Sequence, residues 1–264
     1  MPFPKLSNWW VVEAMIASYN HVYKTVYNSQ YYDLGSIGVS DYGAAPIAAF
    51  QLEFLALDDD PQIVAKAIEN YEINGRKYVV DVFHTQPSAK DVKAQYAEHG
   101  YEFVRTGPIF GYEIPSPVRG ETLEVIKIET KDQLDKANLA LYLENESIPV
   151  VTLNDPYIHN FYAELNGRIA GWAQLVTVYP GTGYINQLYT LTDFRKQQVG
   201  RSLMARTHVE CALHGIQRMT LVSSDMALGL YRRLGYRPLA YFTALQLKEE
   251  LPPPEALTIP LDLS

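Results

Sequence analysis

Residues 184–203, which read YINQLYTLTDFRKQQVGRSL, form the stretch of sequence that decides the fold. Residues 184–191 are rich in aromatic and β-branched side chains, which is typical of a strand. A polar loop follows, and from Val199 onward apolar residues recur at helical spacing. A loop that leads into a helix N-terminus predicts an anion site, because its free backbone N–H groups attract negative charge. Three basic side chains flank this loop: Arg195, Lys196 and Arg201.

The loop at residues 195–200 resembles the acyl-CoA-binding motif of the GNAT (Gcn5-related) N-acetyltransferases, which is Arg/Gln-x-x-Gly-x-Gly/Ala after a central strand. The last glycine of the motif is present as Gly200, whereas Gln198 replaces the first. If that position requires a positive φ, Gln198 adds strain of about 1 kcal/mol or more. The resemblance implies that acetyl-CoA is bound by the strand end and the loop, at Leu188, Tyr189, Thr190, Arg195, Lys196, Gln197, Gln198, Val199, Gly200 and Arg201.

A second segment, SDMALGLYRRLGY at residues 224–236, resembles the other hallmark of the family, Asn-x-x-Ala-x-x-Leu-Tyr-x-x-x-Gly-Phe/Tyr. Ser224 stands where the family usually has Asn, and the resemblance implies that it also contacts acetyl-CoA. Tyr231 matches the family tyrosine that lies near the CoA sulfur and acts as general acid. The other interpretation of Tyr231 is a core aromatic on an amphipathic helix. Taken together, the resemblance covers about residues 123–247.

The general base is not evident from the sequence. Many GNAT proteins carry a carboxylate on the central strand, but Asn186 and Gln187 occupy that region here. A bound water or Glu164 on the adjacent strand are the two candidates. In the GNAT fold, residues 187–191 splay away from the parallel strand at residues 219–223, and the unpaired backbone groups bind pantetheine and the thioester carbonyl.

The two halves of the sequence repeat each other. The segment QYAEHGY at residues 95–101 matches LYRRLGY at residues 230–236 with an offset of 135 residues. The strand ending at Leu57 matches the strand ending at Leu191 with an offset of 134, and Gly75 matches Gly215 with an offset of 140. The first half therefore lacks six residues, which we align with Arg195 to Gly200. An acidic run, Asp58 to Asp60, occupies that place and is expected to repel phosphates.

These patterns predict an α/β protein with a mixed sheet and two tandem copies of the GNAT fold. Residues 1–117 are interpreted as a degenerate GNAT-like domain without the CoA loop, and residues 118–250 as the acetyltransferase domain. Residues 251–264 contain three consecutive prolines and are interpreted as a tail. An Asn-Gly pair at residues 166–167, between two apolar segments, predicts a β-hairpin. Asn8 to Asn28 shows helical spacing and is predicted to be capped by Ser7 or Asn8.

Composition excludes several classes of protein. The net charge of −8 argues against a nucleic-acid-binding protein. The single cysteine, Cys211, argues against a disulfide framework and fits a reducing compartment. The sequence shows neither a signal peptide nor a transmembrane run, so a cytoplasmic location is expected. His208, Cys211 and His214 lie on one predicted helix, a poor geometry for three metal ligands, so no metal site is expected.

The function predicted from these features is transfer of an acetyl group from acetyl-CoA to an amine of a small molecule or peptide, by direct attack in a ternary complex. The expected partners are therefore acetyl-CoA and an amine acceptor, with a homodimer as a further expectation. The alternative is a non-catalytic acyl-CoA-binding or regulatory protein. Gln198, Ser224 and the missing carboxylate on the central strand favour this alternative.

Overall fold

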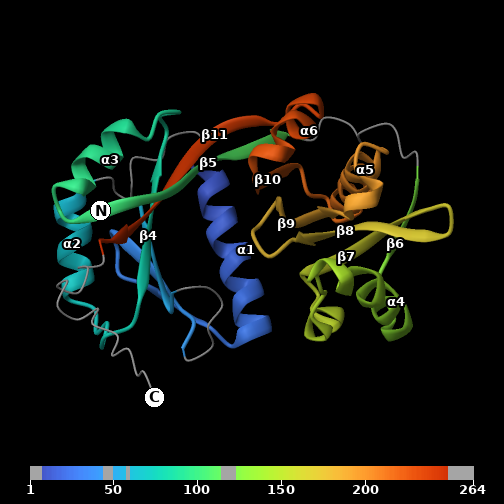
Figure 1. Cartoon of the computed structure of the whole chain (residues 1–264), viewed down its shortest axis with the longest axis horizontal. Coiled ribbons are helices and arrows are strands. Elements are labelled where there is room, and N and C mark those ends of the chain that lie inside the picture. Colours follow the sequence, from blue (N-terminus) through green and yellow to red (C-terminus); the bar gives the residue numbers. More distant parts are fainter. Residues whose placement is uncertain (1–7, 44–49, 58–59, 114–122, 249–264) are drawn as a thin grey trace, which may run out of the picture.

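A mixed sheet of eleven strands organises the part of the chain that the computed structural model describes, residues 8–43, 50–57, 60–113 and 123–248 (Figure 1). The strands follow the order β1-β2-β3-β4-β11-β5-β10-β9-β8-β7-β6. The first half contributes α1 (Trp10–Tyr27), β1 (Gln30–Asp33), β2 (Ile37–Asp41), β3 (Leu52–Ala56), α2 (Pro61–Glu69), β4 (Tyr78–His84), α3 (Lys90–Ala97) and β5 (Tyr101–Glu113).

The second half repeats this order of elements after one additional strand, β6. Short 3-10 turns follow α4, β9 and β10. The elements are β6 (Glu124–Lys127), α4 (Lys131–Leu141), β7 (Ile158–Leu165), β8 (Arg168–Val176), β9 (Thr182–Thr190), α5 (Val199–Leu213), β10 (Arg218–Val222), α6 (Leu228–Arg233) and β11 (Arg237–Leu247).

The two halves have equivalent strand pairing around their parallel strands. In the first half, β3 runs parallel to β4, and in the second half β9 runs parallel to β10. The matched heptapeptides also adopt matching structures, because Tyr96 packs on Tyr101 with 5.7 Å between ring centroids and Tyr231 packs on Tyr236 with 5.8 Å. This agreement confirms the tandem fold that the sequence repeat predicted.

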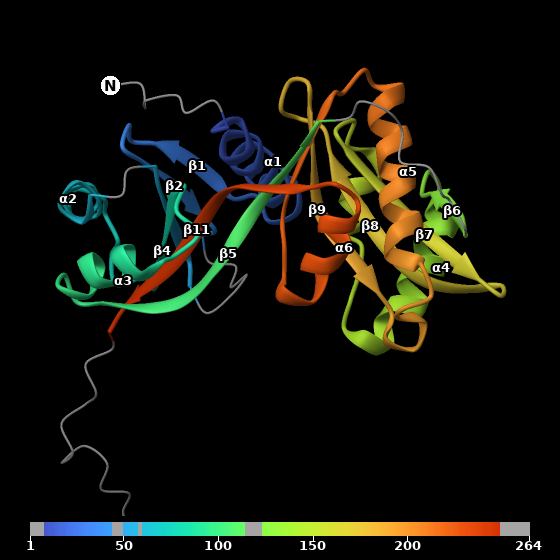
Figure 2. The ribbon, with the colours of Figure 1, turned by 90° about the horizontal axis from the view of Figure 1, so that it is seen from above.

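The last strand of each half is exchanged into the sheet of the other half. β5 of the first half pairs antiparallel with β10, and β11 of the second half pairs antiparallel with β4. β5 and β11 also pair with each other, so they run side by side between the halves (Figure 2). As a result, Phe110 of β5 is buried in the core of the second half and Leu245 of β11 in that of the first. The sequence did not predict this exchange.

Helix α1 lies between the two halves and contacts both (Figure 1). Its apolar side chains pack against β3, β4, β5 and β11 on one side, while Val22 packs against β7, β8 and β9 on the other. No side chain caps its N-terminus, where the structure has Trp9, so the predicted cap by Asn8 is wrong. Ser7 lies outside the described residues.

Local sequence signals explain several element boundaries. Thr130 and Gln133 form a capping box at the start of α4, and Asp60 caps α2 ahead of Pro61 at its first turn. The predicted Asn166-Gly167 hairpin joins β7 to β8, with both residues at positive φ. The expected domain boundary at residues 115–120, the tail at 251–264 and most of the acidic run at 58–60 lie outside the described residues.

Candidate active site

Strands β9 and β10 separate at the point predicted from the family resemblance. Their parallel pairing ends at Ile185, opposite Leu221, whereas β9 continues along β8 as far as Thr190. The register with β8 shifts at this point, so that Asn186 is an extra residue in β9. Such a bulge bends a strand and re-aims its side chains. The C-terminal part of β9 therefore presents a backbone edge that β10 does not pair.

The first half has no such opening. There, β3 pairs with β4 through its last residue, Ala56, opposite Val82. Four residues, 57–60, connect β3 to α2, whereas eight residues, 191–198, connect β9 to α5. The connection in the first half is therefore four residues shorter, rather than the six that the sequence alignment predicted.

The loop before α5 offers free backbone donors. Within the described part of the chain, the backbone N–H groups of Gln198, Val199 and Gly200 find no hydrogen-bond acceptor. Gln198 has φ 67°, so the family's first glycine position does require left-handed backbone here. A Cβ on Gly200 would approach the Leu230 side chain to 3.2 Å and the Thr190 hydroxyl to 3.7 Å. This arrangement fits a phosphate group, because free backbone N–H groups at a helix N-terminus attract negative charge.

Side chains around the loop contribute charge and order. Arg195, Lys196 and Arg201 are exposed at the N-terminal end of α5. Glu144 accepts hydrogen bonds from the Tyr189 hydroxyl at 2.7 Å and from both the backbone N–H and the hydroxyl of Thr192, at 2.7 and 2.9 Å. These contacts tie the end of β9 to the segment after α4 and lower the pKa of Glu144.

Tyr231 lies on α6 and is 4% exposed. Its ring packs against Phe110 at 6.1 Å and Tyr236 at 5.8 Å, and burial raises the pKa of its hydroxyl. At neutral pH the hydroxyl therefore carries its proton. Tyr231 packs in the core of the second half, and its role as general acid stays a prediction.

Glu164 does not lie where a general base is needed. Its carboxylate forms an ion pair with Lys136 of α4, and it does not line the cavity described below. A register shift between Ala163 and Glu164 in the pairing of β7 with β8 sets the direction of this side chain. Glu164 is thus paired with a lysine and lies outside this cavity, and its role as general base stays a prediction from the sequence.

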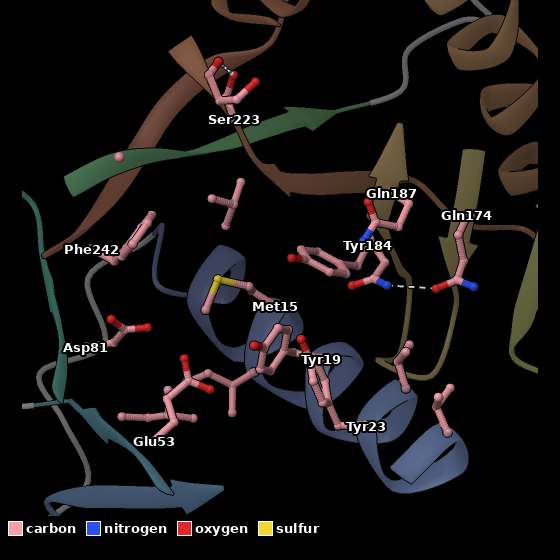
Figure 3. Close-up of a pocket in the computed structure, with 18 of the residues that line it drawn as sticks. Met15, Tyr19, Tyr23, Glu53, Asp81, Gln174, Tyr184, Gln187, Ser223 and Phe242 are labelled. Atoms are coloured by element: carbon pink, nitrogen blue, oxygen red, sulfur yellow. Dashed lines mark hydrogen bonds between the residues drawn. The ribbon is translucent and has the colours of Figure 1, made fainter. Parts of the chain in front are cut away.

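A cavity of about 600 Å³ lies between the two halves and reaches the opening between β9 and β10 (Figure 3). Its walls come from α1, from the strands of the first half and from β8, β9 and the end of β10. This volume is in the usual range for small-molecule sites. The polar and aromatic lining residues include Tyr19, Tyr23, Glu53, Asp81, Arg105, Glu146, Trp172, Gln174, Tyr184, Asn186, Gln187, Ser223, Ser224 and Asp225.

Ser224, which the second motif predicted to contact acetyl-CoA, lines this cavity. The other predicted CoA residues lie at the end of β9, in the loop after it and at the start of α5, and they do not line this cavity. The sequence analysis missed the residues of the first half that line the cavity, because no short-range pattern links them to β9.

A chain of buried amides supports the bulge in β9. Asn186 donates to Gln174 at 2.7 Å, Gln174 donates to Asn160 at 2.9 Å, and Asn160 donates to the Thr152 hydroxyl at 2.9 Å. Each amide donates a hydrogen bond to the next residue of this network, which fixes the orientation of the three amide side chains. Asn186 and Gln174 both line the cavity, and Figure 3 shows Gln174 at its wall.

The structure brings together a group of possible metal ligands that differs from the His208, Cys211 and His214 considered in the sequence. His159, Glu210 and His214 have ligand atoms within 4.8 Å of one another. Glu210 is already paired with Lys127 at 2.5 Å and Arg206 at 3.0 Å. Two cations beside the carboxylate oppose a third, so this cluster is best described as an ion-pair network. His208 instead bonds the Tyr236 hydroxyl at 2.8 Å, and Cys211 is buried.

Comparison with known proteins agrees with this geometry. Residues 123–236 match the model of the acetyltransferase (GNAT) family. No curated protein matches the sequence. Among solved structures, a GCN5-related N-acetyltransferase from Kribbella flavida is similar with a TM-score of 0.66 and 18% identity, over 90% of this chain and 96% of that one.

Two further solved structures extend the comparison. A tandem GNAT protein from the clavulanic acid biosynthesis pathway matches 82% of this chain and 79% of its own, with a TM-score of 0.55 and 11% identity. A GNAT-family putative acetyltransferase from Novosphingobium aromaticivorans has a TM-score of 0.52 and 16% identity, over 88% and 97% of the two chains.

The fold and the opening between β9 and β10 define an acyltransferase-type α/β protein with two equivalent halves. Residues 123–236 form a domain of the GNAT acetyltransferase family, and the GNAT fold extends over most of the chain. None of the described helices combines the length and hydrophobicity that crossing a membrane requires.

Proposed function

We propose that this protein transfers an acetyl group from acetyl-CoA to an amine, using one site in its second half. The observation that carries the proposal is the opening between β9 and β10, with the free N–H groups of residues 198–200 at one end of it. An opened strand edge supplies backbone donors and acceptors to an extended chain such as pantetheine. The helix N-terminus and its basic neighbours supply the charge that a pyrophosphate requires.

The acceptor amine would approach from the cavity side. Its nitrogen attacks the thioester carbonyl carbon, the carbon–sulfur bond breaks, and the amine proton leaves as the thiolate departs. We assign the proton on the thiolate to Tyr231, whose raised pKa keeps its hydroxyl protonated at neutral pH. A neutral hydroxyl can give its proton to the departing thiolate, while the amine proton passes to the general base.

We assign the general base to Glu146, in place of Glu164. Glu146 lines the cavity and is partly buried, and this burial raises the pKa of its carboxyl. A base with a raised pKa is better matched to an amine near neutral pH. Glu146→Gln is expected to lower kcat by about 10²-fold or more and to flatten the acid limb of the pH–rate profile. An unchanged profile in this variant would return the role to a bound water.

The alternative, a non-catalytic acyl-CoA-binding protein, is supported by the absence of a carboxylate from the bulge of β9, where Asn186 and Gln187 stand. Both functions require binding of acetyl-CoA, but only the transferase turns the thioester over. Calorimetric titration with acetyl-CoA, followed by detection of free thiol in the presence of a panel of amines, separates them. Binding of one acetyl-CoA per chain with amine-dependent thiol release supports the transferase, whereas binding without release by any amine supports the alternative.

A further inference from the structure

Two acidic side chains from the first half face the cavity. Glu53 on β3 is 4% exposed and Asp81 on β4 is 7% exposed, and both line the cavity. Figure 3 shows them together at the end opposite Tyr184 and Gln187. β3 and β4 pair along their length, which brings these two strands' side chains together at one wall. Two carboxyl groups at one buried position repel each other when both are ionised.

The hydrogen bonds that these two carboxyl groups could accept are only partly formed. Glu53 accepts a hydrogen bond from the Tyr42 hydroxyl. In contrast, Asp81 shares a hydrogen bond with the Glu53 carboxyl, and its buried Oδ1 atom accepts no further N–H or O–H group within the described part of the chain. An unpartnered buried acceptor is costly, and it is found where a ligand group completes the site. Burial, and for Glu53 the neighbouring Asp81, raise the carboxyl pKa values of this pair, so it retains a proton while the cavity is empty.

The surroundings suit a cation. Tyr19, Tyr23 and Phe242 line the same part of the cavity, and aromatic faces stabilise an ammonium group. Arg105 on β5 is the basic residue that lines the cavity; it is exposed, and its charge partly offsets the raised carboxyl pKa values. Within the described residues, Arg105 forms no ion pair with Glu53 or Asp81, so the pair is left without a protein cation in direct contact.

We propose that Glu53 and Asp81 bind a second cationic group of the acceptor, so that the substrate is a diamine or polyamine with one nitrogen at the opening between β9 and β10. This inference rests on the proposed function for the reacting nitrogen, but the cation site itself does not depend on catalysis. When the ammonium group enters, the pair gives up its shared proton and the new cation takes its place. In this proposal the first half recognises the acceptor substrate, and the second half binds acetyl-CoA.

The test is calorimetric titration of the full chain near neutral pH without acetyl-CoA, using putrescine, cadaverine and spermidine, with butylamine and pentylamine as matched monoamines. The diamines are expected to bind about ten- to hundredfold more tightly than the monoamines of equal length, because only they place a cation on the acidic pair. The measured heat should differ between phosphate and Tris buffers, since a proton is released on binding.

Asp81→Asn should remove the preference for diamines, and Glu53→Gln serves as a second variant if the first fails to fold. Asp91→Asn, at an exposed site on α3, is the matched control and should keep the preference. Affinity for acetyl-CoA should be unchanged in all three. Equal binding of diamines and monoamines, or a preference that survives in both Asp81→Asn and Glu53→Gln, overturns the proposal. Diamine binding without amine-dependent thiol release would instead refute the transferase function alone.

Discussion

The two parallel strand pairs of this protein share a topology and differ in one feature. β3 stays paired with β4 to its end, whereas β9 separates from β10 after Ile185. The closed pair carries the buried carboxyls Glu53 and Asp81, while the opened pair carries free N–H groups and exposed basic side chains. The comparison teaches that two copies of one fold can differ in a single strand pair: the opened pair exposes a backbone edge, whereas the closed pair carries buried carboxyls.

The largest expected difference between the halves concerns their matched tyrosines. Tyr231→Phe removes the proton donor but keeps the ring, so kcat should fall by about 10²–10⁴ while the KM for acetyl-CoA changes little. Tyr96→Phe makes the same change at the equivalent position of α3 and should leave kcat unaltered. Steady-state kinetics with an accepted amine measures both variants. Near-full kcat in Tyr231→Phe would reduce this tyrosine to a packing residue, and thiolate release would then need another donor.

The second residue of α5 should be sensitive to substitution, whereas the second residue of α2 should not be. Gly200→Val places a branched side chain against Leu230 and Thr190 and beside the free N–H groups. Affinity for acetyl-CoA should fall about tenfold or more, because the phosphate can no longer reach the backbone. Gln62→Val on α2 is the control and should bind acetyl-CoA as the unmodified chain does. Equal affinities of the two variants would move the phosphate site elsewhere.

The halves should also respond to pH in opposite directions. His208 in the second half is fully buried, and burial lowers its pKa to about 4 from the ordinary 6.5. It must be neutral in the folded state, so its contribution to the free energy of unfolding is lost as pH falls below 6.5. The shift corresponds to about 3 kcal/mol between pH 6.5 and 4. His208→Gln should therefore reduce the acid-induced loss of stability in urea titrations.

For the carboxyl pair of the first half, the free energy of unfolding changes with pH in the opposite direction. The pKa values of Glu53 and Asp81 are raised by burial, so the folded state holds a proton that the unfolded chain has released. Their contribution is fully present below the ordinary carboxyl pKa and is lost as pH rises through the raised values. Asp81→Asn should accordingly lessen the decline in stability on the alkaline side. A decline of the same slope in this variant would mean that other groups cause it.

The smallest expected effect is at Gln198, where the second half departs from the family motif. Its φ of 67° is strained for a residue with a side chain. Gln198→Gly should raise the free energy of unfolding by up to about 1 kcal/mol, since relief of strain exceeds the entropy that glycine adds to the unfolded chain. Lys196→Gly, at φ 63°, is a matched variant in the same loop. Thermal denaturation that shows a loss of stability for Gln198→Gly would contradict this account.

Much of the second half could be predicted because its signals are local. The Asn166-Gly167 turn, the loop before α5 and the spacing from Ala227 to Tyr236 each depend on residues close together in the chain. The repeat likewise located Tyr96 and Tyr231 at equivalent places. The length of the loop was predicted less well, since the connection before α2 is four residues shorter than its counterpart before α5 and not six.

The sequence alone predicted the GNAT fold and the segment that opens beside β9 through the resemblance of residues 195–200 and 224–236 to the family motifs, and it predicted the duplication through matched segments in the two halves. These signals could be found because each lies within a few consecutive residues. Only the tertiary structure decided which carboxylates face the cavity. Glu164 follows a register shift and pairs with Lys136, while Glu53 and Asp81 line the same cavity as β9 although more than a hundred residues separate them from it in the sequence. The exchange of β5 and β11 likewise depends on long-range strand pairing, which is set by the burial of Phe110 and Leu245 in the opposite cores and leaves no short-range pattern.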